Sequence, residues 1–197
     1  MAQGLLPIQF AAEIRSKKLS GLAGLVAYVE LALAAKLLEW ADRHVDAAGS
    51  RGWTNGVAVL ALVLLNLAGG DCVDDLDRLR EDPGYVNMMA QAARHGRTAG
   101  GLRSLRRRFR RGGKDGGPSS SAGLRYLERF HDPEEEKKRK PETAFVPAPT
   151  AALRGLQRLG SHMVRWTDKQ EPSKVATLDL DATIVESRKR VALFCYK

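Results

Sequence analysis

Val57-Ala58-Val59-Leu60-Ala61-Leu62-Val63-Leu64-Leu65-Asn66-Leu67 decides the fold of this chain, because the run is apolar on nearly every side. A helix without a polar face packs at the centre of a protein core. Extended to Ala68, the run has about 12 residues, whereas a membrane span needs roughly 20. We therefore predict a buried central helix that follows a turn at 52–56 and ends at Gly69-Gly70.

A long amphipathic helix is predicted before this run, from Leu19 to about Ala47. Its apolar residues follow helical spacing, and Ser20 is a candidate N-cap. Glu30 and Lys36 interrupt its apolar surface, which favours a buried core helix over a membrane span. The apolar residues are Leu22, Leu25, Val26, Val29, Leu33, Leu37 and Trp40.

Two shorter helices are predicted after the central run. Asp71 can cap a helix that extends to Leu79, and Asp82-Pro83-Gly84 breaks the chain before another from about Tyr85 to Ala93. Residues 1–93 are therefore interpreted as a helical domain.

The charge of the chain predicts a polyanionic partner, either nucleic acid or an anionic membrane surface. The 197 residues include 32 Lys and Arg against 23 Asp and Glu, for a net charge of +9 and a pI near 9.8. Cys72 and Cys195 lack the spacing of a disulfide framework or a zinc site, so a reducing, cytoplasmic setting is expected.

Residues 94–117 are predicted to form a basic, flexible arm that is interrupted by pairs of glycines. The segment from Arg94 to Lys114 holds nine basic residues and no acid. Such an arm would contact DNA phosphates without reading sequence. The alternative is a solvated charge run with no dedicated partner. The clamp residues that we predict are Arg103, Arg106, Arg107, Arg108, Arg110 and Arg111.

Residues 118–131 are predicted to form a serine-capped helix in which Arg125 and Arg129 lie four positions apart. These two side chains are candidates for a DNA contact of the recognition-helix kind. The alternative is a small packing helix with solvated arginines. A charged, proline-rich linker at 132–149 and a helix within 150–171, from Ala151 to Trp166, are expected to follow.

Two carboxylates occur in Val175-Ala176-Thr177-Leu178-Asp179-Leu180-Asp181-Ala182-Thr183-Ile184-Val185. On a strand, Asp179 and Asp181 would project from the same face, which suits a Mg²⁺ site or an acid/nucleophile pair. The alternative is a half-exposed strand without a functional role, whose two acids face water. Residues 190–196 are apolar enough for a second, antiparallel strand.

The string Asp179-Leu180-Asp181-Ala182-Thr183 resembles the first motif of haloacid-dehalogenase-type phosphatases. That resemblance implies that Asp179 is the nucleophile and Asp181 the general acid.

A second resemblance covers more of the chain. The sequence is similar to the amino-terminal half of bacterial insertion-sequence transposases of the DDE, RNase H-like kind. The blocks that carry it are Leu19 to Leu25, Asn66 to Gly84 with its GG-x-x-x-x-D-x-x-x-L-R-x-D-P pattern, Ser119 to Phe130, and Leu178 to Thr183.

This resemblance implies a mainly α protein: a helical amino-terminal DNA-binding region, then at 172–197 the first β-hairpin of an incomplete RNase H-like α/β domain. It implies that Asp181, or its neighbour Asp179, binds catalytic Mg²⁺ for DNA strand cleavage and transfer. The later carboxylates of that family have no counterpart before Lys197, so we expect a truncated transposase that is inactive alone.

The expected partner of such a protein is double-stranded DNA at the ends of the element, in the cytoplasm and associated with the nucleoid. No membrane partner is expected, and a homo-oligomer is left open. A phosphatase fragment that uses Asp179 and Asp181, and a non-catalytic DNA-binding remnant, are the alternative functions.

Overall fold

The computed structural model describes residues 4–8, 20–47, 52–96, 116–140, 146–172 and 174–175. These residues are mainly helical, as predicted, and contain no strand. The hairpin expected at 172–197 lies almost wholly outside them. The elements are α1 (Leu25–Ala34), α2 (Leu37–His44), α3 (Asn55–Leu67), α4 (Asp75–Leu79), α5 (Pro83–Arg94), α7 (Ser120–Leu127), the 3-10 helix η1 (Glu128–Phe130), α8 (Pro133–Glu136) and α9 (Ala151–Gln170).

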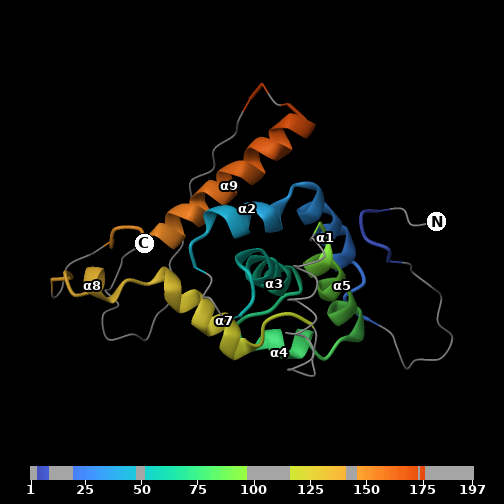
Figure 1. Cartoon of the computed structure of the whole chain (residues 1–197), viewed down its shortest axis with the longest axis horizontal. Coiled ribbons are helices and arrows are strands. Elements are labelled where there is room, and N and C mark those ends of the chain that lie inside the picture. The colour runs from blue at the N-terminus through green and yellow to red at the C-terminus, as the bar shows by residue number, and fades with distance from the viewer. Residues whose placement is uncertain are drawn as a thin grey trace, which may run out of the picture.

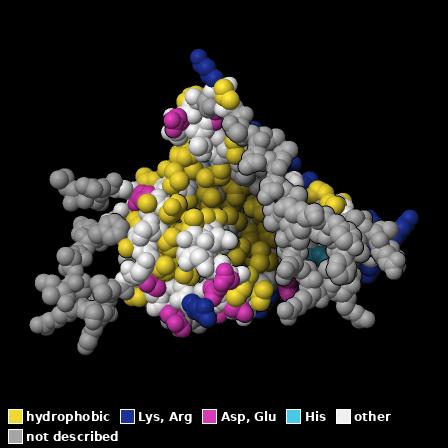
Figure 2. All heavy atoms as spheres, turned by 180° about the vertical axis from the view of Figure 1, so that it is seen from behind, with side chains coloured by type: hydrophobic (Ala, Val, Ile, Leu, Met, Phe, Trp, Pro, Cys, Tyr) yellow, Lys and Arg dark blue, Asp and Glu magenta, His cyan; other side chains and the backbone are white. Residues whose placement is uncertain are grey.

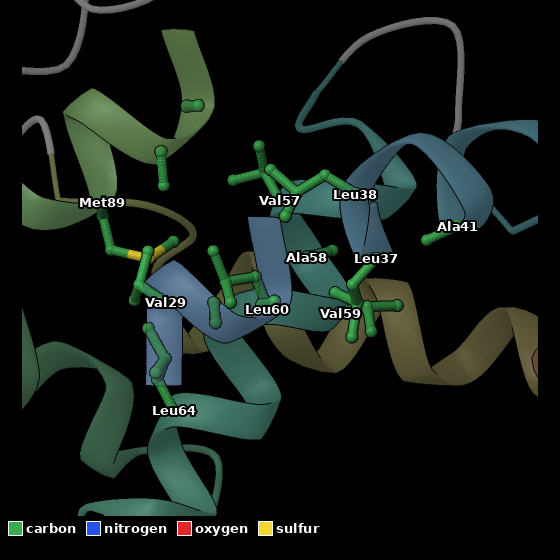
Figure 3. Close-up of a cluster of buried hydrophobic side chains, with 14 of the residues drawn as sticks. Val29, Leu37, Leu38, Ala41, Val57, Ala58, Val59, Leu60, Leu64 and Met89 are labelled. Carbon is green, nitrogen blue, oxygen red and sulfur yellow. The ribbon is translucent and has the colours of Figure 1, made fainter. Parts of the chain in front are cut away.

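Helix α3 lies at the centre, with the other main helices around it (Figure 1). Its hydroxyl cap is Thr54, whose Oγ1 accepts a hydrogen bond from the Val57 N–H. The side chains of Val57, Leu60 and Leu64 are at most 1% exposed and pack among Leu37, Leu38 and Val29 from the first two helices (Figure 3). The prediction of a buried central helix is confirmed.

The prediction of a single helix from Leu19 to Ala47 is wrong, because the chain forms two helices there. Lys36 adopts a left-handed conformation with φ of 57°, which interrupts the helical hydrogen bonds between α1 and α2. The break changes the chain direction, so that Leu37, Leu38 and Ala41 of α2 are buried against α3. Ser20 does not cap α1: its hydroxyl accepts a hydrogen bond from the Leu22 N–H, within turns that precede Leu25.

Helix α2 is held between α3 and α9 at two glycines. A Cβ at Gly56 would lie 2.7 Å from the Leu38 Cα, and a Cβ at Gly155 would lie 2.8 Å from the Val45 Cα. Only glycine lets the helix backbones approach this closely. Asp42 strengthens the contact between α2 and α3 at Gly56, because its Oδ1 accepts a hydrogen bond from the Gly56 N–H at 2.5 Å.

The core extends beyond residue 93. Tyr126 of α7 and Ala152 and Leu159 of α9 belong to the same buried hydrophobic cluster as α1 to α5. Helix α9 runs to Gln170, four residues farther than expected, and its carboxyl end projects beyond the other described helices (Figure 1). None of the helices among the described residues is long and apolar enough to span a membrane.

Helix α4 begins at Asp75 rather than after an Asp71 cap. The Asp75 carboxylate instead accepts hydrogen bonds from the backbone N–H groups of Asp71 and Cys72, at 3.0 and 3.2 Å. These bonds lower the pKa of Asp75, and nearby Arg78 adds to the effect. The Asp75 carboxylate, in the first turn of α4, therefore binds the backbone of the residues that precede the helix.

Candidate nucleic-acid interface

Helix α7 presents Arg125, and η1 presents Arg129, from a firmly packed support. The Ser119 hydroxyl caps the helix by accepting the Ala122 N–H, as the sequence predicted. Gly123 lies so close to α4 that a Cβ there would be 2.8 Å from Leu76 Cδ1. Tyr126 is buried, while both arginines are exposed to solvent. The helix thus has one face in the core and leaves the guanidinium groups on its surface.

A hydrogen bond also fixes the start of α7 to α4. The Ser120 hydroxyl donates to Asp77 Oδ2 at 2.5 Å, and Arg80 donates to Asp77 Oδ1 at 2.9 Å. The Ser120 bond lowers the pKa of Asp77, with a further contribution from Arg80. This carboxylate therefore remains charged and holds two elements that are 43 residues apart in the sequence.

Five of the described cations outside α7 and α9 form an ion pair with an acid three residues earlier. Such pairs occur on α4 and around α8. Arg125 and Arg129 form no ion pair with any described acid, so their charges are available to a ligand. The paired residues are Asp75–Arg78, Asp77–Arg80, Glu134–Lys137, Glu135–Lys138 and Glu136–Arg139.

The other site residues predicted from the sequence lie outside the described residues. They are the arm residues Arg103, Arg106, Arg107, Arg108, Arg110 and Arg111 and the two carboxylates Asp179 and Asp181. Among the residues that the structure does describe, no group of three His, Cys, Asp or Glu side chains is placed to hold a metal ion.

A pocket of about 470 Å³ lies between α2 and the end of α5. Its described lining includes the acids Glu39 and Asp42, the guanidinium of Arg43, and His95. The negative charge of the two acids disfavours a phosphate in this pocket. We therefore do not assign the pocket to a nucleic acid.

The face opposite to the view of Figure 1 is apolar at its centre, with acidic and basic side chains around its edges (Figure 2). Large hydrophobic side chains that remain exposed in the described chain include Tyr28 and Leu31 of α1 and Val63 and Leu67 of α3. A surface without cations at its centre does not suit a polyanion, so the candidate interface lies elsewhere.

Two histidines, His44 and His162, have a packing role in the structure. The Trp40 ring stacks with His44, at a centroid distance of 4.6 Å, and with His162 of α9, at 3.9 Å. His162 Nε2 also donates to the Ala35 carbonyl at 2.9 Å. The signal for His44 was its position four residues after Trp40, but nothing local indicated His162.

Comparison with known proteins adds no assignment: no protein-family model, curated protein sequence or solved structure matches this chain.

Proposed function

We propose that this chain is the amino-terminal part of a DDE transposase of a bacterial insertion sequence, and that it binds double-stranded DNA. The observation that carries the DNA-binding part is the exposure of Arg125 and Arg129, unpaired among described acids, on elements packed into the core. Arginine at such positions favours phosphate, because its planar guanidinium can form two parallel hydrogen bonds to an oxyanion.

The block from Asn66 to Gly84 supports the proposal through its physical role in the fold. Gly69, with φ of 79°, follows α3 and ends it, α4 supplies Leu76 and Leu79 to the core, and Pro83 begins α5. The sequence pattern that resembles the transposases therefore forms the connection that α7 packs against, through Gly123. We infer that the pattern supports the DNA-binding helix.

In this proposal Asp181 is the first catalytic carboxylate and a Mg²⁺ ligand, with Asp179 beside it on the first strand of an RNase H-like domain. A bound Mg²⁺ pair would stabilise the charge on the attacking and leaving oxygens of a phosphodiester. DNA binding is the activity that we assign to these 197 residues.

Titration of the full chain with duplex DNA at rising salt tests the proposal. Binding should weaken as salt increases, and Arg125→Gln with Arg129→Gln should reduce the slope of log K against log salt by about 1.8, since each lost phosphate contact removes about 0.9. Two cations that are ion-paired, Lys137 and Lys138, supply the control: Lys137→Gln with Lys138→Gln removes the same charge and should leave the slope nearly unchanged. Binding that does not respond to salt would reject the proposal.

The phosphatase alternative is tested separately. Hydrolysis of a generic phosphomonoester by the chain, abolished by Asp179→Asn, would favour a phosphatase and reject the transposase assignment. We expect no such hydrolysis above a no-enzyme blank.

A further inference from the structure

Helix α9 carries four cations along one side. Arg154, Arg158, Arg165 and Lys169 fall at offsets of 0, 4, 11 and 15 residues, which places them within about 60° of one another around the helix axis. All four are exposed. Together they form a stripe, called here the α9 basic stripe, about 22 Å long at 1.5 Å per residue.

The buried side of α9 fixes the orientation of the helix on the core. Ala152, Gly155 and Leu159 face the core, and Gly155 brings the α9 backbone against the end of α2. His162 extends this anchorage through its stacking on Trp40 and its hydrogen bond to the Ala35 carbonyl. The orientation of the stripe is therefore fixed by the fold before any ligand binds.

The stripe contrasts with the charge pattern of α4 and α8. In or just after those helices, five Lys or Arg side chains are paired with an acid three residues earlier. On α9 the one acid is Asp168, and none of the four cations forms an ion pair with a described acid. Within the part of the chain that the structure describes, the Arg154 guanidinium donates to the Pro149 carbonyl, at 2.5 Å.

The spacing within the stripe is unfavourable for the helix alone. Arg154 and Arg158 are four residues apart, as are Arg165 and Lys169, and like charges at this spacing repel and destabilise a helix. An anion bound across each pair would remove the repulsion. The pattern therefore points to a ligand with repeated negative charges.

We propose that the α9 basic stripe binds the phosphate backbone of double-stranded DNA, as a second contact surface besides Arg125 and Arg129; this inference rests on the proposed DNA-binding function. Four phosphate contacts over about 22 Å correspond to roughly six base pairs at 3.4 Å per base pair. Such contacts position the protein on a duplex and carry no sequence information.

A membrane surface fits the stripe less well. A helix that lies on a membrane inserts its apolar face between the lipids. Part of the apolar surface of α9 is already occupied, because Ala152 and Leu159 belong to the hydrophobic core, and the large hydrophobic side chains that stay exposed are Leu153, Leu156 and Val164. What remains exposed on α9 is mainly its polar side, which suits phosphates presented by a rigid duplex.

The test uses the full chain and a labelled 30-base-pair duplex, with affinity measured between 50 and 200 mM salt. The stripe variant combines Arg154→Gln, Arg158→Gln, Arg165→Gln and Lys169→Gln. Loss of four contacts should lower the salt slope by about 3.6, so that over this range the wild type loses about 150-fold more affinity than the variant does. The control variant removes four ion-paired cations through Arg78→Gln, Lys137→Gln, Lys138→Gln and Arg139→Gln, and its slope should stay near that of the wild type.

Circular dichroism and urea unfolding report whether the variants fold. The stripe variant should be at least as stable as the wild type, because two repulsive pairs are removed. If it fails to fold, Arg165→Gln with Lys169→Gln in the outer half of α9 replaces it, with an expected slope change of about 1.8.

The outcomes separate this inference from the function on which it rests. A wild type that binds DNA, together with a stripe variant of unchanged slope, would overturn the inference and leave the proposed function intact. A wild type without DNA binding would overturn both. Loss of binding to phosphatidylserine vesicles, with DNA binding unchanged, would overturn the inference in favour of a membrane contact.

Discussion

Replacing Gly155 with alanine should destabilise the protein, whereas the same change at Gly160, five residues along the same helix, should stabilise it. Both glycines lie within α9. Nothing lies within 4 Å of the position that a Cβ would occupy at Gly160. At Gly155 the added carbon would be 2.8 Å from the Val45 Cα, and it would also meet the His44 carbonyl.

The magnitudes follow from two opposing effects. Alanine is favoured over glycine in a helix interior by about 1 kcal/mol, and this gain applies at both positions. Overpacking a well-filled site costs about 1–3 kcal/mol, and the cost at Gly155 is at the upper end because backbone atoms cannot rotate away. We expect Gly155→Ala to lose about 2 kcal/mol and Gly160→Ala to gain between 0.5 and about 1 kcal/mol.

Thermal unfolding followed by circular dichroism measures the difference. For a chain of this size 1 kcal/mol corresponds to about 2–4 °C, so Gly155→Ala should unfold about 4–8 °C below the wild type. Hydrogen exchange should also increase in α9 of that variant, because the helix packs less closely on α2. Equal changes in stability for the two variants would refute the close approach of α9 and α2 at Gly155.

Three further predictions concern side chains in the helical core and its caps. Asp82 Oδ1 accepts the Tyr85 N–H at 2.8 Å and caps α5, so Asp82→Ala should cost about 1 kcal/mol in urea unfolding and Asp82→Asn almost nothing. The Tyr85 hydroxyl is buried without a hydrogen-bond partner among the described residues, so Tyr85→Phe should keep or raise stability at pH 7. Burial also raises the pKa of Tyr85, which means that the wild type should lose stability as the pH rises above about 10, and Tyr85→Phe should lose less between pH 9 and about 11. The Ser120 bond lowers the pKa of Asp77, so the stability that this carboxylate contributes is present above a pH of about 4 and is lost as the pH falls. Asp77→Asn should therefore make the free energy of unfolding less dependent on pH in the acid range. An unchanged pH dependence would count against the link between α4 and α7.

Local chemistry in the sequence predicted much of the helical fold. The apolar run at 57–67 predicted the central helix, and Ser119 marks the start of α7 through a cap that the structure contains. The break at Lys36 could not be predicted, because neither glycine nor proline signals it and the apolar spacing continues across it. Tertiary packing imposes the left-handed residue, since it brings Leu37 and Ala41 onto α3.

The candidate interface was predictable only in part, for a similar reason. Glycine has a low helix propensity, so nothing local favours Gly123 within α7, whereas the structure shows it as the point where α7 approaches Leu76 of α4. A close approach depends on which segment lies opposite, and the partner here is 47 positions away in the sequence. Helical periodicity reports that a face is apolar, but it does not report what covers that face.

The distribution of charge gives the strongest reason to examine α9 experimentally. Nine of the 32 basic residues lie between Arg94 and Lys114, which leaves 23 against the 23 acids of the chain. The rest of the protein is therefore neutral on balance, and a generally basic composition does not explain the four cations and one acid of α9. Because their i, i+4 spacing disfavours the free helix, this local excess is most simply understood as a surface for an anion that binds along its length.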